Sequence, residues 1–164
     1  MVDPARGAGI PPRIPLGSAG REPAQATRRR RPVQDHKEVV VRVGLAIMVK
    51  TPGHSPVKAC LAADTGPDFA DEWHGRSADC VSKVARACRD TEPHWAVAEL
   101  SAFAAGAWQG LPCLLQGAGD MGQRMASVHT QLMANHDAAI LIGADLPQLT
   151  AELLSQAAYS ALLA

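Results

Sequence analysis

The chain has 164 residues, of which 16 are Lys or Arg and 16 are Asp or Glu, so its formal net charge is zero. This balance argues against a protein held to nucleic acid or to an acidic membrane by overall charge, and the length suits a single domain. The four cysteines are scattered, without a CxxC pair or a close Cys/His cluster, which is untypical of structural zinc sites and of disulfide frameworks. We therefore expect reduced thiols and a cytoplasmic protein that does not span a membrane.

Residues 1–38 have the composition of a solvated tail. They contain several prolines, more basic than acidic residues and the run Arg28–Arg31, with almost no apolar periodicity. Such a segment buries too little apolar surface to offset the entropy lost on folding. The four arginines could bind polyphosphate or nucleic acid or belong to a targeting peptide, but the prolines would interrupt a targeting helix. A solvated tail, or a start codon assigned too far upstream, is favoured, with one folded domain over residues 39–164.

The first element of that domain is expected to be a buried strand followed by a loop. Val39–Val49 is β-branched and nearly all apolar, which predicts a strand. The next stretch, Lys50–Lys58 (KTPGHSPVK), contains two prolines and a glycine and predicts a loop. Two lysines and backbone amides at the carboxyl end of a strand can cradle a polyphosphate. The alternative is a pair of solvated surface lysines, which is the commoner outcome for this residue type.

The middle of the chain alternates between helix and strand patterns. Residues 66–90 predict a helix with acidic residues early and basic residues late, which complements the helix dipole. Residues 94–100 predict a second strand, 101–109 a short helix and 111–116 a third strand. We expect Trp73 and His74 to be packing and surface residues. Cys113 is expected to be an inert core thiol, because an apolar setting raises the pKa of a thiol.

A second apolar run, Ala138–Ile142, is followed by Gly143 and a single acidic residue, Asp145. The run predicts a strand of a parallel sheet that is buried on both faces. Leu146-Pro147 then stops the strand, and Thr150 can cap the helix that follows. Ligands of open α/β sheets bind outside the carboxyl ends of the strands, so Asp145 is placed to bind a metal or a sugar hydroxyl. Alternatively, Asp145 is only a turn residue or an early cap.

Gly117–Gly122 (GAGDMG) matches GxGxxG, the phosphate-binding pattern of dinucleotide-binding folds. Asp145 even follows the next strand, roughly where a ribose-binding acid would lie. Two observations weaken this assignment. Asp120 lies inside the glycine loop, where its charge would face the pyrophosphate, and only a short stretch of chain follows Asp145. An NAD(P)-binding oxidoreductase fragment is therefore a further alternative.

Three motifs in order carry a resemblance to a known family. They are Lys50-Thr-Pro-Gly-His-Ser-Pro-Val-Lys58-Ala-Cys-Leu61, Gly119-Asp-Met-Gly-Gln-Arg-Met125 and Gly143-Ala-Asp-Leu-Pro-Gln-Leu149. This order resembles the bacterial glycosyltransferase-like family of glycosyltransferase A fold, which is related to nucleotidyltransferases and is associated with arsenosugar biosynthesis. The resemblance implies a nucleotide-diphospho-sugar transferase domain of three-layer α/β/α architecture, with a mostly parallel, Rossmann-like sheet.

The resemblance also implies roles for particular residues. Lys50 and Lys58 would lie near the nucleotide phosphates, and Gly119, Asp120 and Arg124 would line the nucleotide or sugar side of the pocket. Asp145 would be the catalytic residue and would ligate Mg²⁺ or Mn²⁺ bridging the diphosphate, because such cations take carboxylate and phosphate oxygens.

Three residues of these motifs could instead have purely structural roles. Arg124 could simply pair with Asp120 at i,i+4 spacing, which stabilises a helix by roughly 0.2–0.5 kcal/mol. Met121 and Met125 are expected in the core.

The sequence also departs from the family pattern. Ala59-Cys60 stands where the family has Thr-Arg, so a guanidinium suited to phosphate is missing. Family members also continue beyond the position that corresponds to Ala164. We expect a sheet incomplete at its C-terminal side, with an exposed edge that self-association could cover. The leading hypothesis is transfer of a sugar from a nucleotide diphosphate to an unknown acceptor, and the alternative is a catalytically inactive, truncated member.

Overall fold

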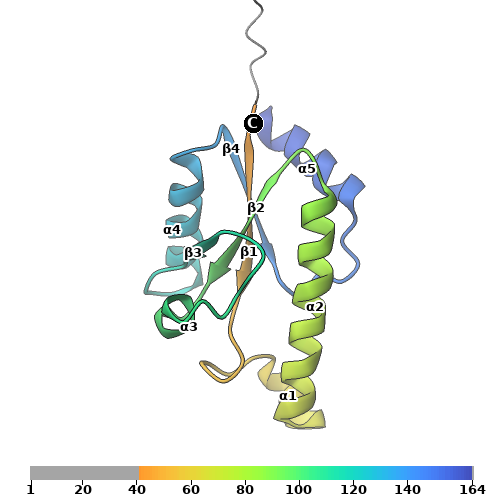
Figure 1. The fold of residues 1–164 in the computed structure, drawn as a ribbon, viewed down its shortest axis with the longest axis vertical. Coiled ribbons are helices and arrows are strands. Elements are labelled where there is room, and N and C mark those ends of the chain that lie inside the picture. The colour runs from red at the N-terminus through yellow and green to blue at the C-terminus, as the bar shows by residue number, and fades with distance from the viewer. Residues whose placement is uncertain (1–40, 164) are drawn as a thin grey trace, which may run out of the picture. The chain divides into compact units, whose positions relative to one another are not determined.

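The computed structural model describes residues 41–163. The tail expected over residues 1–38 lies outside the described residues. The described strands form one parallel sheet in the order β3-β2-β1-β4 (Figure 1). Their bounds are β1 Val43–Val49, β2 Glu92–Val97, β3 Cys113–Leu115 and β4 Ala138–Gly143.

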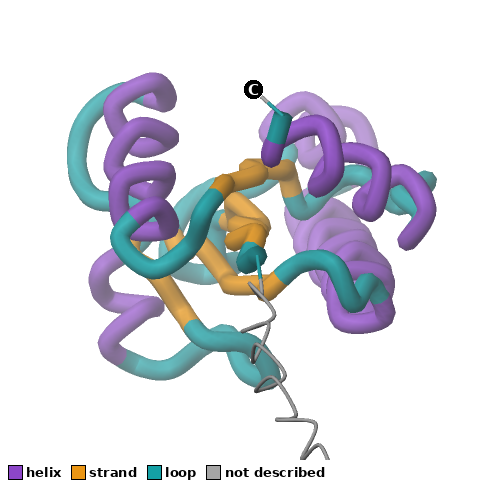
Figure 2. The backbone as a smooth tube through the Cα atoms, turned by 90° about the horizontal axis from the view of Figure 1, so that it is seen from above, coloured by secondary structure: helices purple, strands orange, loops and turns teal. Residues whose placement is uncertain are grey.

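The helices cover both faces of the sheet (Figure 2). They are α1 Ala59–Thr65, α2 Pro67–Ala87, α3 Leu100–Ala104, α4 Met121–Met133 and α5 Ala151–Leu162. Helices α2 and α5 pack on one face, and α4 packs on the other. The predicted α/β class with a three-layer arrangement and a parallel sheet is confirmed. Within residues 41–163, none of the helices combines the length and the apolar character needed to cross a bilayer.

Strand β1 is the centre of the core because its side chains alternate between the two faces. Leu45, Ile47 and Val49 are buried in the cluster that also contains residues of α2 and α5. Ala46 belongs to the cluster formed with Val128 and Leu132 of α4. Two-residue alternation therefore lets one strand serve both layers.

Gly44 of β1 allows a close approach between the sheet and α4. A Cβ atom at this position would lie 2.9 Å from Leu132 Cδ2 and 2.9 Å from His136 Nδ1. A side chain here would have to displace the Leu132 and His136 side chains, which pack against this strand.

Several predicted boundaries were wrong in detail. The second strand begins two residues earlier than expected and ends at Val97, because the chain turns into α3 at Leu100. Helix α1 was not predicted, and the helix expected over residues 66–90 is α2, which ends at Ala87. Thr150 caps α5 as expected, since its hydroxyl accepts from the Leu153 amide.

Two predictions of burial were also wrong. Strand β4 was expected to be buried on both faces, but most of its residues are only partly buried. It is an edge strand among the described strands, paired only with β1. Met121 and Met125 were expected in the core, but they are 60% and 43% exposed. They lie in the first turns of α4, whereas its buried residues, Val128 and Leu132, lie further along the helix.

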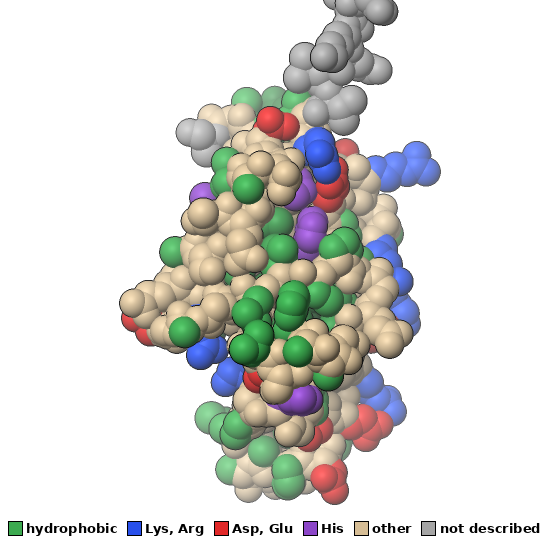
Figure 3. Space-filling view, turned by 60° about the vertical axis from the view of Figure 1, so that its left-hand side comes forward, with side chains coloured by type: hydrophobic (Ala, Val, Ile, Leu, Met, Phe, Trp, Pro, Cys, Tyr) green, Lys and Arg blue, Asp and Glu red, His purple; other side chains and the backbone are tan. Residues whose placement is uncertain are grey.

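The side of the molecule formed by α3, β3 and α4 carries part of this exposed apolar surface. Figure 3 turns that side forward and shows hydrophobic side chains gathered over it. The exposed hydrophobic residues of α3 and α4 are Leu100, Phe103, Met121, Met125 and Met133.

Candidate functional site

The register of the sheet brings several loop residues together at one end. Val49 of β1 pairs with Val97 of β2, and Met48 of β1 pairs with Gly143 of β4. The chain segments that leave these strands therefore begin side by side. A cavity of about 320 Å³ lies there, at the carboxyl ends of the strands, where open α/β sheets bind their ligands. Its lining consists of Met48, Val49, Lys50, Val57, Lys58, His74, Gln116, Met121, Arg124, Gly143, Ala144 and Asp145.

An ion pair between Lys58 and Asp145 dominates the electrostatics of this cavity. The Lys58 ammonium donates to Asp145 Oδ2, and the same ammonium lies 5.3 Å from the centre of the Trp73 ring. The hydrogen bond from Lys58 holds the pKa of Asp145 below its ordinary value, while partial burial opposes this shift. Asp145 is therefore an ionised acceptor in an ion pair.

The backbone at Lys58 is unusual as well. Its φ is 46°, the only positive φ of a non-glycine residue in the described part of the chain. A lysine in the left-handed region costs about 1 kcal/mol relative to glycine, and such costs concentrate at functional sites. The residue is the N-cap of α1, so this conformation fixes the direction in which the loop leaves the cavity.

Of the other predicted site residues, two line the cavity and two do not. Lys50 and Arg124 line the cavity, and Arg124 Nε donates to Gly119 O at 2.9 Å. Gly119 and Asp120 are absent from the lining. The Asp120 carboxylate caps α4 by accepting from the Gln123 amide at 2.9 Å. The alternative ion pair between Asp120 and Arg124 is wrong, because both side chains bond elsewhere.

Two buried polar residues of the cavity were missed from the sequence. His74, expected at the surface, is only 5% exposed, and its Nε2 faces Lys50 O at 2.9 Å. Gln116 is 3% exposed and follows β3. The one signal for Gln116 was its position as the first polar residue after the apolar run LPCLL.

The metal-ligating side chains of the cavity can hold a divalent cation only if a ligand supplies further oxygens. No group of three His, Cys, Asp or Glu side chains able to hold a metal occurs within residues 41–163. Of the residues that the structure describes, Asp145 is the single carboxylate that lines the cavity. Mg²⁺ is commonly held by one or two carboxylates together with substrate phosphates, and it keeps several waters. Asp145 fits a cation that arrives with a phosphate ligand.

The structure does not favour dinucleotide binding at Gly117–Gly122. This loop follows β3, which is an edge strand of the described sheet. The start of α4, where a pyrophosphate would bind, is taken by the Asp120 carboxylate.

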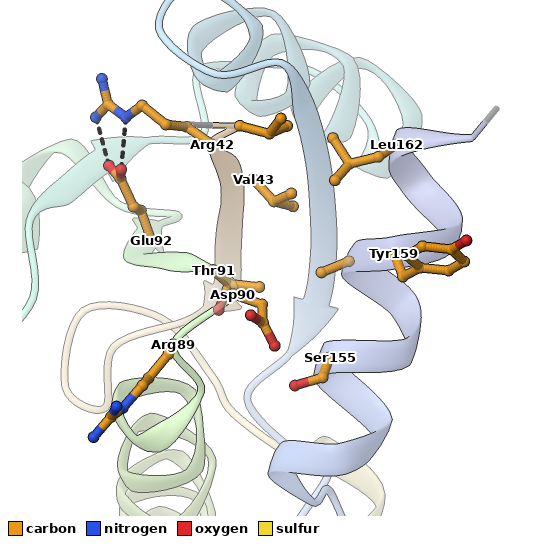
Figure 4. A pocket seen from close by; sticks show the side chains of 11 residues that line it. Arg42, Val43, Arg89, Asp90, Thr91, Glu92, Ser155, Tyr159 and Leu162 are labelled. Carbon is orange, nitrogen blue, oxygen red and sulfur yellow. Dashed lines mark hydrogen bonds and ion pairs between the residues drawn. The ribbon is translucent and has the colours of Figure 1, made fainter. Parts of the chain in front are cut away.

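A second cavity, of about 390 Å³, lies at the opposite ends of the strands and is shown in Figure 4. Two of its charged groups are paired with each other: Arg42 donates to both oxygens of Glu92 at 2.6 and 2.7 Å. This ion pair lowers the pKa of Glu92 to about 2. The cavity at the carboxyl ends of the strands is the better candidate, because ligands of open α/β sheets bind at that end.

Comparison with known proteins places the chain in a family. The model of DUF2064, described as an uncharacterized protein conserved in bacteria, matches residues 79–163, which is more than half of the chain. The chain belongs to this family. No curated protein matches it significantly.

A solved structure shows the same fold. It is a candidate nucleotide-diphospho-sugar transferase from Desulfovibrio desulfuricans G20, with a TM-score of 0.63 and 21% identity. The match covers 73% of this chain and 54% of that protein, so the chain spans about half of its relative's length. Neither comparison supports the oxidoreductase alternative.

Proposed function

We propose that the protein binds a nucleotide-diphosphate sugar in the cavity at the carboxyl ends of the strands and transfers the sugar to an acceptor. The observation that carries this proposal is the pairing of Lys58 with Asp145 at the strand end, beside Lys50 and Arg124. The fold shared with a candidate transferase of this class supports it. The four unpaired cysteines suit a cytoplasmic protein.

The charged groups divide the work of holding a diphosphate. The ammonium groups of Lys50 and Lys58 and the guanidinium of Arg124 neutralise phosphate charge. Asp145 would hold Mg²⁺ or Mn²⁺ that arrives with the diphosphate. The cation would supply charge stabilisation for the leaving nucleoside diphosphate.

Binding of such a ligand weakens the Lys58–Asp145 pair. Lys58 and a cation compete for the same carboxylate in the empty protein, whereas a diphosphate gives the ammonium new acceptors. The Trp73 ring, whose centre is 5.3 Å from the ammonium, attracts it electrostatically.

One observation favours a second candidate function, nucleotide binding without transfer. Among residues 41–163, Asp145 is the only carboxylate of the cavity lining, and it would be occupied by the cation. Within the described part of the chain, no second carboxylate lines the cavity to take a proton from an acceptor.

Release of nucleoside diphosphate separates these functions. The protein is incubated with UDP-, GDP- and CDP-sugars and Mn²⁺, and products are followed by ³¹P NMR, with Asp145→Asn as the control. The transferase predicts nucleoside diphosphate from one donor, lost in the variant. Binding of the donor without its turnover supports the second candidate. Absence of binding to any donor contradicts both.

A further inference from the structure

Gln116 is a buried side chain whose orientation the structure determines. Its Nε2 donates to Val49 O at 3.2 Å and to Ala96 O at 2.8 Å. Both partners are backbone carbonyls, which can only accept, so these contacts identify the nitrogen and the oxygen of the amide. Both hydrogens of the amide nitrogen are consumed by the ends of β1 and β2.

The oxygen of the same amide remains available. No group among residues 41–163 donates a hydrogen bond to Gln116 Oε1. The atom is also not fully buried, unlike the unpaired side-chain atoms of His74, Ser77 and Thr91. Gln116 lines the cavity that contains Lys58 and Asp145. A buried amide oxygen at a cavity wall is costly to leave unpaired when a ligand covers it, so it selects ligands that donate a hydrogen bond.

We propose that Gln116 is a specificity-determining residue that accepts a hydrogen bond from the imide N–H of a uracil or guanine base. The inference rests on the proposed function, since it concerns the base of the same nucleotide ligand. Lys58 and Asp145 supply the charged part of the cavity, for the diphosphate. Met48, Val49 and Met121 supply apolar lining, which suits the face of a base.

The fixed orientation also excludes one mode of base recognition. A glutamine reads adenine by donating from its nitrogen and accepting with its oxygen at the same time. Gln116 has no free donor, because both hydrogens are held by the backbone. It acts as an acceptor only, and adenine nucleotides are therefore not read by a bidentate contact here.

The decisive test changes the ligand, so that it does not depend on a variant that folds. Binding of UDP and GDP is compared with that of 3-methyluridine and 1-methylguanosine diphosphates, which lack the imide N–H, and with the 2′-deoxy diphosphates. Calorimetry in the presence of Mn²⁺ measures each affinity. We expect N-methylation of the preferred base to weaken binding at least tenfold and the 2′-deoxy change to leave it within threefold.

A matched pair of variants provides the second arm. Gln116→Met removes the acceptor, and Val49 O keeps its other bond, from the Ala98 amide at 3.0 Å. Gln131→Met is the control, because Gln131 Nε2 also donates to a backbone carbonyl, Leu115 O, but the residue does not line the cavity. We expect Gln116→Met to bind the natural and the N-methylated diphosphates equally, and Gln131→Met to keep the wild-type preference.

The possible failures are distinguishable. Tight binding that is indifferent to N-methylation overturns the role of Gln116 and leaves the proposed function intact. Sensitivity only to the 2′-deoxy change overturns the assignment to the base. Absence of binding by any diphosphate to folded wild-type protein overturns this inference together with the proposed function.

Discussion

Replacing Lys58 by methionine tests the competition between an ammonium and a cation for Asp145. The two charges would interact by about 4 kcal/mol at 4 Å with an effective dielectric constant near 20. The side chains are 26% and 46% exposed, however, so solvent screening reduces the net value to about 1 kcal/mol. One kcal/mol corresponds to about a fivefold change in an equilibrium constant.

We therefore expect Lys58→Met to bind Mn²⁺ about fivefold more tightly than wild type in the absence of nucleotide, and to bind nucleoside diphosphates more weakly. Water-proton relaxation measures free and bound Mn²⁺ during a titration. Lys50→Met is the matched control, since it removes the same charge from the lining, while no ion pair described for residues 41–163 involves Lys50. The reasoning is refuted if Lys58→Met binds Mn²⁺ no better than wild type, or if Lys50→Met gains as much.

The remaining predictions concern stability and reactivity. Asp120→Ala removes the cap of α4 and should lower the free energy of unfolding by about 1 kcal/mol in urea titrations, whereas a role of Asp120 in ligand binding alone predicts no change. Because the folded-state pKa of Glu92 is lowered to about 2 by Arg42, its contribution to stability is present above its unfolded pKa and is lost as the pH falls toward 2. Glu92→Gln should flatten the pH dependence of unfolding between about pH 4.5 and 2, and an unchanged slope would contradict the ion pair. Exposed Cys60 should react with a thiol reagent at pH 7.5 much faster than Cys113, whose pKa is raised by burial; comparable rates would show that Cys113 is open to solvent.

The strands were predictable from the sequence because β-branched apolar runs have few other outcomes. The strands predicted over Val39–Val49 and Ala138–Ile142 were recognised by composition alone, and they correspond to β1 and β4. Parallel pairing followed from the helices between the strands. The burial of Ala138–Gly143 was overestimated, because composition does not reveal whether a strand has one neighbour or two. The prediction that Met121 and Met125 lie in the core was wrong for a related reason. Helical spacing does not show where the sheet beneath a helix ends.

The candidate site was predictable where a charged residue directly follows a strand. Lys50 and Asp145 were identified in this way, and the structure puts both in one cavity. Their roles as ligand-binding groups remain predictions. Gln116 and His74 were missed because their positions depend on contacts with Val49 O, Ala96 O and Lys50 O, which are distant in sequence. Long-range hydrogen bonds of this kind leave no periodic signal.

The most direct test of the account is a calorimetric titration of UDP, GDP and CDP, with NAD as a control, into wild-type protein and Asp145→Asn, each with and without Mg²⁺. The account predicts that Mg²⁺ strengthens binding of one diphosphate to wild type at least tenfold. Asp145→Asn should bind the diphosphate without Mg²⁺ at least as tightly as wild type, because Lys58 is no longer paired with a carboxylate, and it should lose the gain from Mg²⁺. Binding that ignores Mg²⁺, or a gain that survives Asp145→Asn, would contradict the assignment of Asp145 as the group that holds the cation.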